Sequence, residues 1–573
     1  MSGMKENTST ITSGRQADRL IDFPARLESW AGWLSRHADA LVLGFVLVFL
    51  MVGIATLPNY GMTWDEGLGN FFFGERYLRY LTSFSEKYLD FKADLAGLKK
   101  LPLYLFISPY HDHPYHYPPV VDILSAATMY LFSYRLGWMD PVDGFHVLKI
   151  ILAAVFLWAM YRFAAPRLGK FAAFTAVVLL GVFPRFWGDM HFNPKDIPEL
   201  IFYSLTIMAY VLWYEKPDRI YALVVGILFG CALGTKANAV FLPVVLVLGV
   251  WPIGFSLRSF KQVLLHLKQC WSHYFIMGLS GLAFYFITWP YLYADPKRVK
   301  MYWDFIFARG VQEGRTAWNW RSPLQVIVTM PEWMLVLLVV GIVLVVIRTF
   351  REEHFIWRLL LVWLVVPILR ISLPGMVDFD GIRHFMEFLP AAVLVAGYGA
   401  ATFPGLVAKG RVALEMGVKS AVLVVLVFNL VGIQRVYNQY EYLYYNRLIG
   451  GLTGAREVFG DFEVTDYWAS SYRKGMDWLN ENAEQGASLY VPVADWLAQI
   501  TGPLYLRPDI QILDGEDPGS ISGAGGPVYV MFVTRSGFYD EIAYDLSRNN
   551  PPDYQIVVDG VSIMQIHKIQ PGR

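Results

Sequence analysis

Residues 41–57 read LVLGFVLVFLMVGIATL, and the segment Thr63-Trp64-Asp65-Glu66-Gly67 follows this apolar run after a short gap. Since a helix needs roughly 20 mainly apolar residues to cross a bilayer, the run predicts a first membrane span. Asp65 and Glu66 then lie where this span meets water. An enzyme could use such carboxylates to deprotonate a substrate delivered by lipid, although acidic residues also stabilise a helix N-terminus and the pair could be only an interfacial cap.

Most of the remaining chain is equally apolar. Of its 573 residues, 55% are hydrophobic and only 17% are charged, which is far more apolar than an ordinary soluble domain. The run 118–136 begins with Pro118-Pro119 and contains Arg135, so we expect it to insert only partly. The other runs predict spans near residues 145–164, 171–186, 197–213, 220–235, 238–256, 273–290, 325–347, 357–373, 385–403 and 420–433. The predicted fold class is a polytopic α-helical membrane protein with about 11 to 13 transmembrane helices.

Basic residues indicate which loops face the cytoplasm, because Lys and Arg are enriched there. Basic turns after the second, fourth, sixth, eighth and tenth spans fit one topology. It divides the chain into a cytoplasmic tail with an interfacial helix (1–40), a transmembrane domain with a first outer loop at 58–144 (41–433), and an extracytoplasmic domain (434–573). In this last part, a helix near 468–483 and β-like runs at 488–493, 528–534 and 555–566 predict a small α/β domain.

Charge, cysteine content and patterning argue against several classes of protein. The formal net charge is zero, so nothing indicates nucleic-acid binding. Cys231 and Cys270 fall in or beside apolar runs and are not expected to form a disulfide or a metal site. The spans carry almost no charge at their centres, and the chain shows no evident internal repeat. Transporters commonly have charged residues within their spans and are commonly built from internal repeats. A lipid or sugar transporter is therefore a disfavoured alternative.

One short loop between two predicted spans combines several chemically active residues. Residues 184–198 contain Arg185, Asp189, His191, Asn193 and Asp196. Capping of the next helix by Asn193 or Asp196 explains part of this composition. A solvated turn does not need acids, cations and an imidazole together, so we expect this loop to contribute to a functional site on the outer face.

A histidine-rich segment lies in the first outer loop. The imidazole side chains of His113 and His116 can bind metals, and the two residues are spaced as metal ligands often are. A divalent metal ion is therefore a candidate cofactor. The alternative is a Pro-rich surface loop whose imidazoles are solvated or hydrogen bonded.

Two further outer segments carry cations suited to phosphate. Lys236 interrupts two apolar runs, where it could bind a phosphate as a point charge or simply extend to the membrane surface. Asp380, Arg383 and His384 lie between two spans. The planar guanidinium of an arginine can bind two phosphate oxygens at once.

Together these segments resemble the GT-C superfamily of polytopic glycosyltransferases, in particular bacterial proteins similar to protein O-mannosyltransferases and to the aminoarabinose transferase of lipid A. The resemblance runs from about residue 41 to 400 and rests on segments in a given order. These are Asp65-Glu66, Tyr117-Pro118-Pro119, the loop 193–198, Gly234-Thr235-Lys236, and the segment 380–384. Tyr117 stands where the family usually has a histidine.

The resemblance implies that a sugar passes from a polyprenyl-phosphate donor to a hydroxyl group with inversion. Membrane lipids are partners, and the acceptor is a lipid, a cell-envelope glycan or a protein. Asp65 would be the general base, with assistance from Glu66, at the outer face of a bacterial cytoplasmic membrane. The donor phosphate would be bound by Lys236, Arg383 and Arg185. The sugar or a divalent ion would be oriented by Asp189, His191, Asn193, Asp196, His113, His116, Asp380 and His384.

Two other functions remain open at this point. An oligosaccharide ligase or polymerase that uses pyrophosphate-linked donors would share the lipid carrier and the membrane face. A membrane scaffold would offer no reason for carboxylates and cations to converge from separate loops. The segment 291–324, which contains Trp318 and Trp320, is expected to be an extended lid over the site or a set of interfacial anchors.

Overall fold

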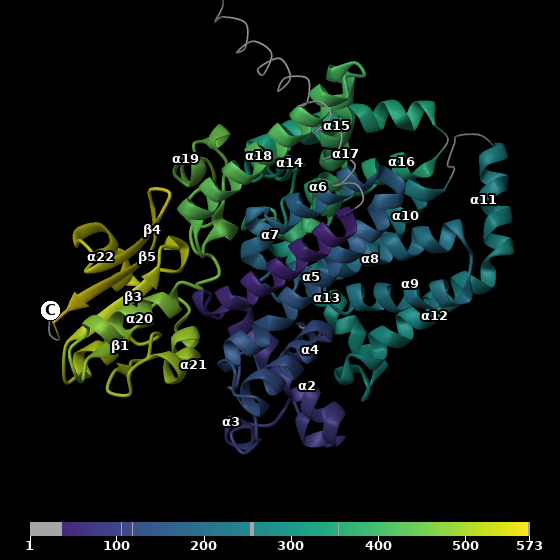
Figure 1. Cartoon of the computed structure of the whole chain (residues 1–573). Coiled ribbons are helices and arrows are strands. Elements are labelled where there is room, and N and C mark those ends of the chain that lie inside the picture. Colours follow the sequence, from purple (N-terminus) through teal and green to yellow (C-terminus); the bar gives the residue numbers. More distant parts are fainter. Residues whose placement is uncertain (1–36, 105, 117, 252–256, 353, 571–573) are drawn as a thin grey trace, which may run out of the picture.

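The computed structural model describes residues 37–570 apart from 105, 117, 252–256 and 353 (Figure 1). The predicted N-terminal tail and interfacial helix, except residues 37–40, and Tyr117 lie outside the described residues. In the described part, seven helices are long and apolar enough to cross a membrane. A pair of helices bent by 69°, Lys261–Gln269 and Trp271–Ile287, would make an eighth. The chain is therefore a multi-pass membrane protein.

Fewer helices than predicted have the length of a full crossing. The seven are His37–Asn59, Pro141–Leu168, Asp196–Glu215, Glu332–Arg351, Phe355–Ser372, Arg383–Ala408 and Leu414–Tyr437. Helices over the predicted spans near 171–186, 220–235 and 238–256 are shorter: Lys170–Gly181, Arg219–Leu233 and Ala237–Val250. The apolar runs thus locate the helices, but glycine, proline and polar breaks end some of them before they reach full length.

The run 118–136 is not a full span, as its composition predicted. It forms α4 (Val120–Met129) and a π-helical turn, Tyr130–Arg135. The segment 291–324 is not an extended loop. It contains the helix α13 (Val299–Gln312) and the start of α14 (Arg321–Val328), because the apolar and aromatic positions of 299–312 recur at helical spacing and pack Tyr302 into the interior.

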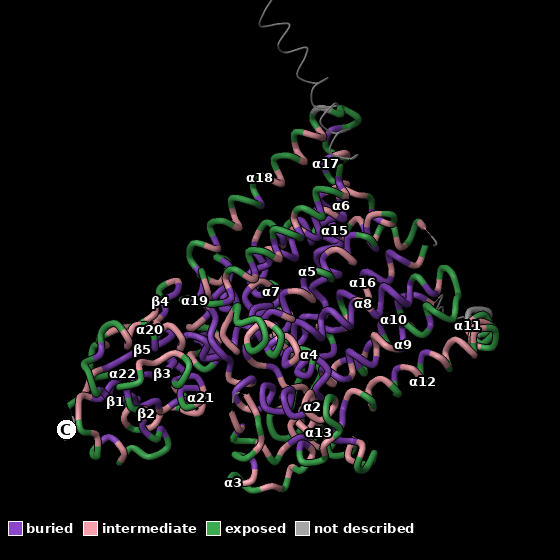
Figure 2. The backbone as a smooth tube through the Cα atoms, turned by 60° about the horizontal axis from the view of Figure 1, so that its bottom comes forward, coloured by how far each residue is buried: buried purple, intermediate pink, exposed green. Residues whose placement is uncertain are grey.

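The buried core of the helical part lies among α5 (Pro141–Leu168), α6 (Lys170–Gly181), α8 (Asp196–Glu215) and α17 (Leu389–Ala408). Figure 2 shows these helices mostly buried, whereas α18 (Val412–Tyr437) runs along the outside. Close approach of α17 to α6 requires Gly397, since a Cβ there would clash with the carbonyl oxygen of Ala172. Small residues at such contacts are typical of helix packing in membranes.

The other helices surround this core. They are α2 (Phe71–Ser83), α3 (Leu95–Leu98), α7 (Pro184–Asp189), α9 (Arg219–Leu233), α10 (Leu242–Val250), α11 (Leu257–Gln269), α12 (Trp271–Ile287), α15 (Glu332–Arg351) and α16 (Phe355–Ser372).

The chain after α18 forms a small α/β unit beside one end of the helices (Figure 1). Its sheet has the order β2-β1-β3-β5-β4, with β1 parallel to β2 and β3, and β5 antiparallel to β3 and β4. The strands are β1 (Ser488–Tyr490), β2 (Gln511–Ile512), β3 (Val528–Val533), β4 (Tyr554–Val558) and β5 (Val561–Ile569). The helices are α19 (Gly451–Phe459), α20 (Tyr472–Asn482), α21 (Asp495–Tyr505) and α22 (Glu541–Asn549).

One of the predicted strands is in fact a hairpin. The run 555–566 spans both β4 and β5, which are joined at Asp559 and Gly560. Both residues have positive φ, 44° and 82°, and an Asp-Gly pair favours a two-residue hairpin turn for this reason.

Candidate functional site

Asp65 lies at the mouth of the site, just after the first membrane helix. The residues that follow it, Glu66–Asn70, form a π-helical turn that leads into α2. The backbone N–H of Trp64 donates to the carbonyl oxygen of Trp468 at 2.9 Å, so the C-terminal unit holds this loop. The Asp65 side chain keeps 38% of its surface exposed, which leaves its carboxylate accessible to a substrate.

Glu66 points away from the mouth and is fully buried. One of its carboxylate oxygens accepts from Lys149 Nζ at 2.9 Å, and the other lies 2.9 Å from His146 Nε2. That second oxygen also accepts from the backbone N–H and the hydroxyl of Thr63, both at 3.0 Å. These charges hold the pKa of Glu66 at about 2 despite its burial. Glu66 therefore anchors the loop that carries Asp65, in contrast to the direct contact with acceptor or ion that we expected.

Arg383 connects Asp65 to a group of buried carboxylates. Its guanidinium nitrogens lie 3.9 Å from Asp65 Oδ2, 3.5 Å from Asp196 Oδ2 and 2.9 Å from Asp380 Oδ2. The opposite oxygen of Asp196 pairs with Lys236 Nζ at 2.5 Å. The structure thus brings together residues from four predicted segments, 63–67, 193–198, 234–236 and 380–384. Asp196 and Asp380 are only 2% exposed and have closer ion-pair contacts, whereas Asp65 is 38% exposed and its contact with Arg383 is the longest of the three.

The loop between α7 and α8 is shaped by Asn193. Its side-chain oxygen accepts from the backbone N–H groups of Lys195 and Asp196 at 3.1 and 2.8 Å, so it caps the first turn of α8. Its amide nitrogen donates to Asp189 Oδ1 at 3.3 Å and Asp196 Oδ2 at 2.9 Å. Burial, and then the charge of Asp196, raise the pKa of Asp189 to about 7. Asp189 and Asn193 therefore help to position Asp196.

The C-terminal unit contributes two residues that were not among the predicted site residues. Arg535 donates to Asp380 Oδ1 at 3.1 Å, and the indole N–H of Trp468 donates to Asp189 Oδ1 at 3.1 Å. The guanidinium of Arg383 also lies 4.6 Å from the centroid of the Trp468 ring, a cation–π contact. No motif marks Arg535, because it reaches the site only through the tertiary fold.

Lys195 is a third residue that the sequence analysis did not place in the site. Burial lowers the pKa of its ammonium, while the charges of Asp122 and Asp65 act in the opposite direction. Its position between Asn193 and Asp196, both selected from the sequence, was the signal that could have identified it.

Arg185 takes a supporting position. Its Nε donates to the carbonyl oxygen of Tyr444 at 3.2 Å, and its guanidinium lies 4.7 Å from the centroid of the Tyr445 ring. The side chain is 1% exposed and sits against Gly381, where a Cβ would clash with it. Arg185 therefore supports the turn of Asp380 and Gly381, which have φ of 58° and 74°.

The predicted histidines do not form one cluster. His191 is buried between Thr56 Oγ1, 2.9 Å from Nε2, and the carbonyl oxygen of Trp187, 2.8 Å from Nδ1; burial lowers its pKa to about 3. Its ring stacks on Tyr60 with centroids 3.9 Å apart. His191 is thus a neutral packing residue.

Of the other three histidines, His113 and His116 are neighbours, with ring centroids 5.1 Å apart, whereas His384 lies beside Lys236. His113 is 2.5 Å from the Asp112 carboxylate, and His116 stacks on Phe305 with centroids 3.8 Å apart. His384 places Nδ1 3.5 Å from Lys236 Nζ, and its carbonyl oxygen accepts from Asn238 and Arg370, both at 2.9 Å. His384 therefore belongs to the Lys236 side of the site.

The arrangement does not fit a resident divalent ion. Among the described residues, no group of three or more His, Cys, Asp or Glu side chains is placed to hold a metal. The oxygens of Asp196 and Asp380, which could have served as ligands, are instead neutralised by Lys236, Arg383 and Arg535. The cationic charge of the site is thus supplied by side chains.

Comparison with known proteins places part of this chain beside a transferase family. Residues 112–280 match the family model described as dolichyl-phosphate-mannose-protein mannosyltransferase, in agreement with the resemblance to the GT-C superfamily. No curated protein matches the chain.

Several solved structures are similar to the whole chain at low identity. ArnT from Cupriavidus metallidurans, bound to undecaprenyl phosphate, is 14% identical with a TM-score of 0.47 over 93% of this chain and 98% of that one. The Archaeoglobus fulgidus oligosaccharyltransferase, tethered to an acceptor peptide, is 12% identical with a TM-score of 0.43 over 88% and 70%. The arabinofuranosyltransferase AftD from Mycobacteria is 13% identical with a TM-score of 0.40 over 87% and 35%.

Proposed function

We propose that this chain is an inverting glycosyltransferase that moves a sugar from a polyprenyl-phosphate donor to a hydroxyl group of an acceptor. The observation that carries the proposal is the arrangement of Asp65 and Arg383. An accessible carboxylate lies 3.9 Å from a guanidinium that is fixed by two buried carboxylates. The match of residues 112–280 to the mannosyltransferase family model supports a lipid-phosphate sugar as the donor class.

Asp65 would act as the general base. Its partial exposure allows the acceptor hydroxyl to approach within hydrogen-bonding distance, which general base catalysis requires. As the hydroxyl proton passes to Asp65, the hydroxyl oxygen forms a bond to the anomeric carbon. The bond between that carbon and the phosphate oxygen breaks, and its electron pair leaves with the polyprenyl phosphate. One direct displacement of this kind inverts the anomeric centre.

The cations beside Asp65 would stabilise the leaving phosphate. Arg383 offers a planar pair of donors, and Lys236 offers a point charge on the far side of Asp196. Because both are held by ion pairs before a substrate arrives, little reorganisation is needed as negative charge develops.

The acceptor would enter past the C-terminal unit. Trp64 packs against Trp496 and Phe538, each with ring centroids 5.1 Å from its own, so aromatic side chains from this unit border the residue next to the base. This arrangement supports a catalytic domain at residues 41–433 and a covering domain at 434–573. The distribution of basic turns supports a site on the extracytoplasmic face, and the proposed membrane is the cytoplasmic membrane of a bacterium.

A donor panel tests this proposal. Purified protein in detergent is supplied with polyprenyl-phosphate and polyprenyl-pyrophosphate sugars and a native membrane extract as the acceptor source. We expect wild-type protein to release free polyprenyl phosphate from at least one monophosphate donor and Asp65→Asn to release none. Consumption of pyrophosphate donors alone would indicate an oligosaccharide ligase, and no release by folded wild-type protein from any donor would contradict the transferase function.

A further inference from the structure

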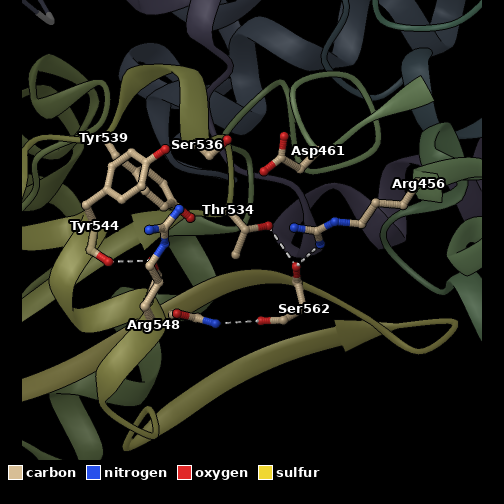
Figure 3. Close-up of a pocket in the computed structure, with 10 residues that line it drawn as sticks. Arg456, Asp461, Thr534, Ser536, Tyr539, Tyr544, Arg548 and Ser562 are labelled. Carbon is tan, nitrogen blue, oxygen red and sulfur yellow. Dashed lines mark hydrogen bonds between the residues drawn. The ribbon is translucent and has the colours of Figure 1, made fainter. Parts of the chain in front are cut away.

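A polar pocket lies in the C-terminal unit, outside the proposed catalytic site. It encloses about 240 Å³ and is bordered by α19, the residues after β3, α22 and the start of β5. Its lining consists of two arginines, one aspartate and a majority of hydroxyl groups (Figure 3). The lining residues are Arg456, Asp461, Thr534, Ser536, Tyr539, Tyr544, Ser547, Arg548, Ser562 and Gln565. We propose that this pocket binds an anionic sugar unit, one that carries a carboxylate or a phosphate.

The two guanidinium groups supply the site for the anionic group. Figure 3 shows Arg456 and Arg548 on opposite sides of the pocket, with Thr534 and Ser562 between them. Arg456 donates to the carbonyl oxygen of Ser562 at 3.2 Å, and Arg548 lies 4.7 Å from the centroid of the Tyr544 ring. Within the described part of the chain, neither forms an ion pair with a carboxylate. Both can therefore direct N–H groups at a bound carboxylate or phosphate.

Asp461 and the hydroxyl groups favour a sugar over a bare anion. A free phosphate would gain from two guanidinium groups but would be repelled by the Asp461 carboxylate. A sugar presents hydroxyl groups that can donate to Asp461, while Ser536, Tyr539 and Gln565 can exchange hydrogen bonds with the others. The volume suits a single sugar ring, and the face of Tyr539 is only half-buried.

The pocket adjoins the residues of the C-terminal unit that lie near Asp65. Ser536 follows Arg535, which binds Asp380, and Asp461 precedes Phe462, whose ring lies 4.2 Å from the Arg535 guanidinium carbon. Phe462 also stacks on Phe538, with centroids 5.7 Å apart. A saccharide that reaches the mouth of the site could therefore place one of its charged units in this pocket.

Direct binding tests the inference without requiring turnover, so a failure here is separate from a failure of the proposed function. Full-length protein in detergent is titrated calorimetrically with glucuronate, glucose 6-phosphate, glucose and inorganic phosphate. We expect saturable binding of the two charged sugars, at least tenfold tighter than that of glucose or of inorganic phosphate. The relative affinity of the two charged sugars identifies the carboxylate or the phosphate as the preferred group.

Two pocket variants and one control locate the binding. Arg548→Gln changes an exposed side chain, so it should weaken the binding of the charged sugars at least tenfold without altering the unfolding temperature. We expect the same result for Arg456→Gln. Arg447→Gln, at an exposed arginine outside the pocket, should leave binding unchanged. Equal binding of glucose or inorganic phosphate, binding unaffected by Arg548→Gln, or no binding of either charged sugar would overturn the inference.

Discussion

At the scale of single residues, Glu441 makes the stability of this protein depend on pH. Its side chain is 1% exposed and accepts from the hydroxyl of Tyr60 at 2.8 Å. Burial raises its pKa from 4.5 to about 7. Between these values the folded protein retains a proton that the unfolded chain has released, so the free energy of unfolding falls as the pH rises through this window.

The variant Glu441→Gln removes this titration and keeps an acceptor for Tyr60. We expect wild type and variant to unfold at similar temperatures near pH 5. At pH 8 the variant should be more stable, by at most about 3 kcal/mol. Thermal unfolding in detergent between these pH values gives the comparison, and parallel profiles for the two proteins would show that Glu441 titrates normally.

Most residues that meet around Arg383 could be predicted from the sequence. Asp65, Asp196, Lys236, Asp380 and Arg383 were all selected from short motifs, and the structure brings these five together. The opposite orientations of adjacent Asp65 and Glu66 could not be predicted, because they depend on a π-helical turn and on two buried partners from α5, His146 and Lys149.

At the scale of elements, α19 depends on a contact between its first turn and the β4–β5 turn. Asp559 Oδ2 accepts from the backbone N–H of Leu452 and from the hydroxyl of Tyr437, both at 2.8 Å. Gly451 has φ of 67°, and a Cβ there would clash with the same carboxylate oxygen. The turn therefore holds the start of α19 and the end of α18 together.

Alanine at Gly451 should release this contact. Gly450 offers a matched control, since its φ is 88° but a Cβ there would meet its nearest atom at 3.4 Å, an ordinary contact. Each substitution should cost roughly 1–2 kcal/mol for a left-handed backbone. We expect Gly451→Ala to lower the unfolding temperature at least twice as much as Gly450→Ala; equal losses would mean that backbone strain accounts for the whole effect.

Helix and strand positions were predictable where the local pattern of apolar and polar residues determines the element. Apolar runs located every helix of the core, whereas the hairpin was missed although Asp559-Gly560, which separates the apolar positions of β4 from those of β5, is itself a hairpin signal. Helix length was overestimated at 171–186, 220–235 and 238–256, because hydropathy does not report where packing against neighbours ends a helix.

At the scale of the whole molecule, Arg535 links the C-terminal unit to the site. It bridges Asp380 and the carbonyl oxygen of Tyr467 at 3.1 and 3.2 Å, and Asp380 in turn holds Arg383. Substitution by Met leaves Asp380 without one of its two cations. We expect Arg535→Met to lower turnover at least tenfold, because Arg383 is then less firmly positioned beside Asp65.

A control variant separates this effect from general instability. Arg507→Gln removes a guanidinium that donates to the carbonyl oxygens of Asn480 and Ala483 within the C-terminal unit, away from Asp380. It should lower the unfolding temperature and leave turnover within about twofold of wild type. Similar turnover losses in both variants would mean that Arg535 acts only through the stability of the unit. The contact itself could not be predicted, since it joins residues that are 155 positions apart.

The role of Asp65 as the general base is tested most directly by a single turnover. Protein preloaded with the donor identified in the panel is mixed with acceptor, and sugar transfer is followed for wild type and Asp65→Asn, with donor binding measured separately. If Asp65 is the base, the variant should retain the donor affinity and the fold of wild type while transfer slows by at least about 100-fold, the contribution expected of a general base. Transfer within tenfold of wild type, with the donor bound, would contradict this role.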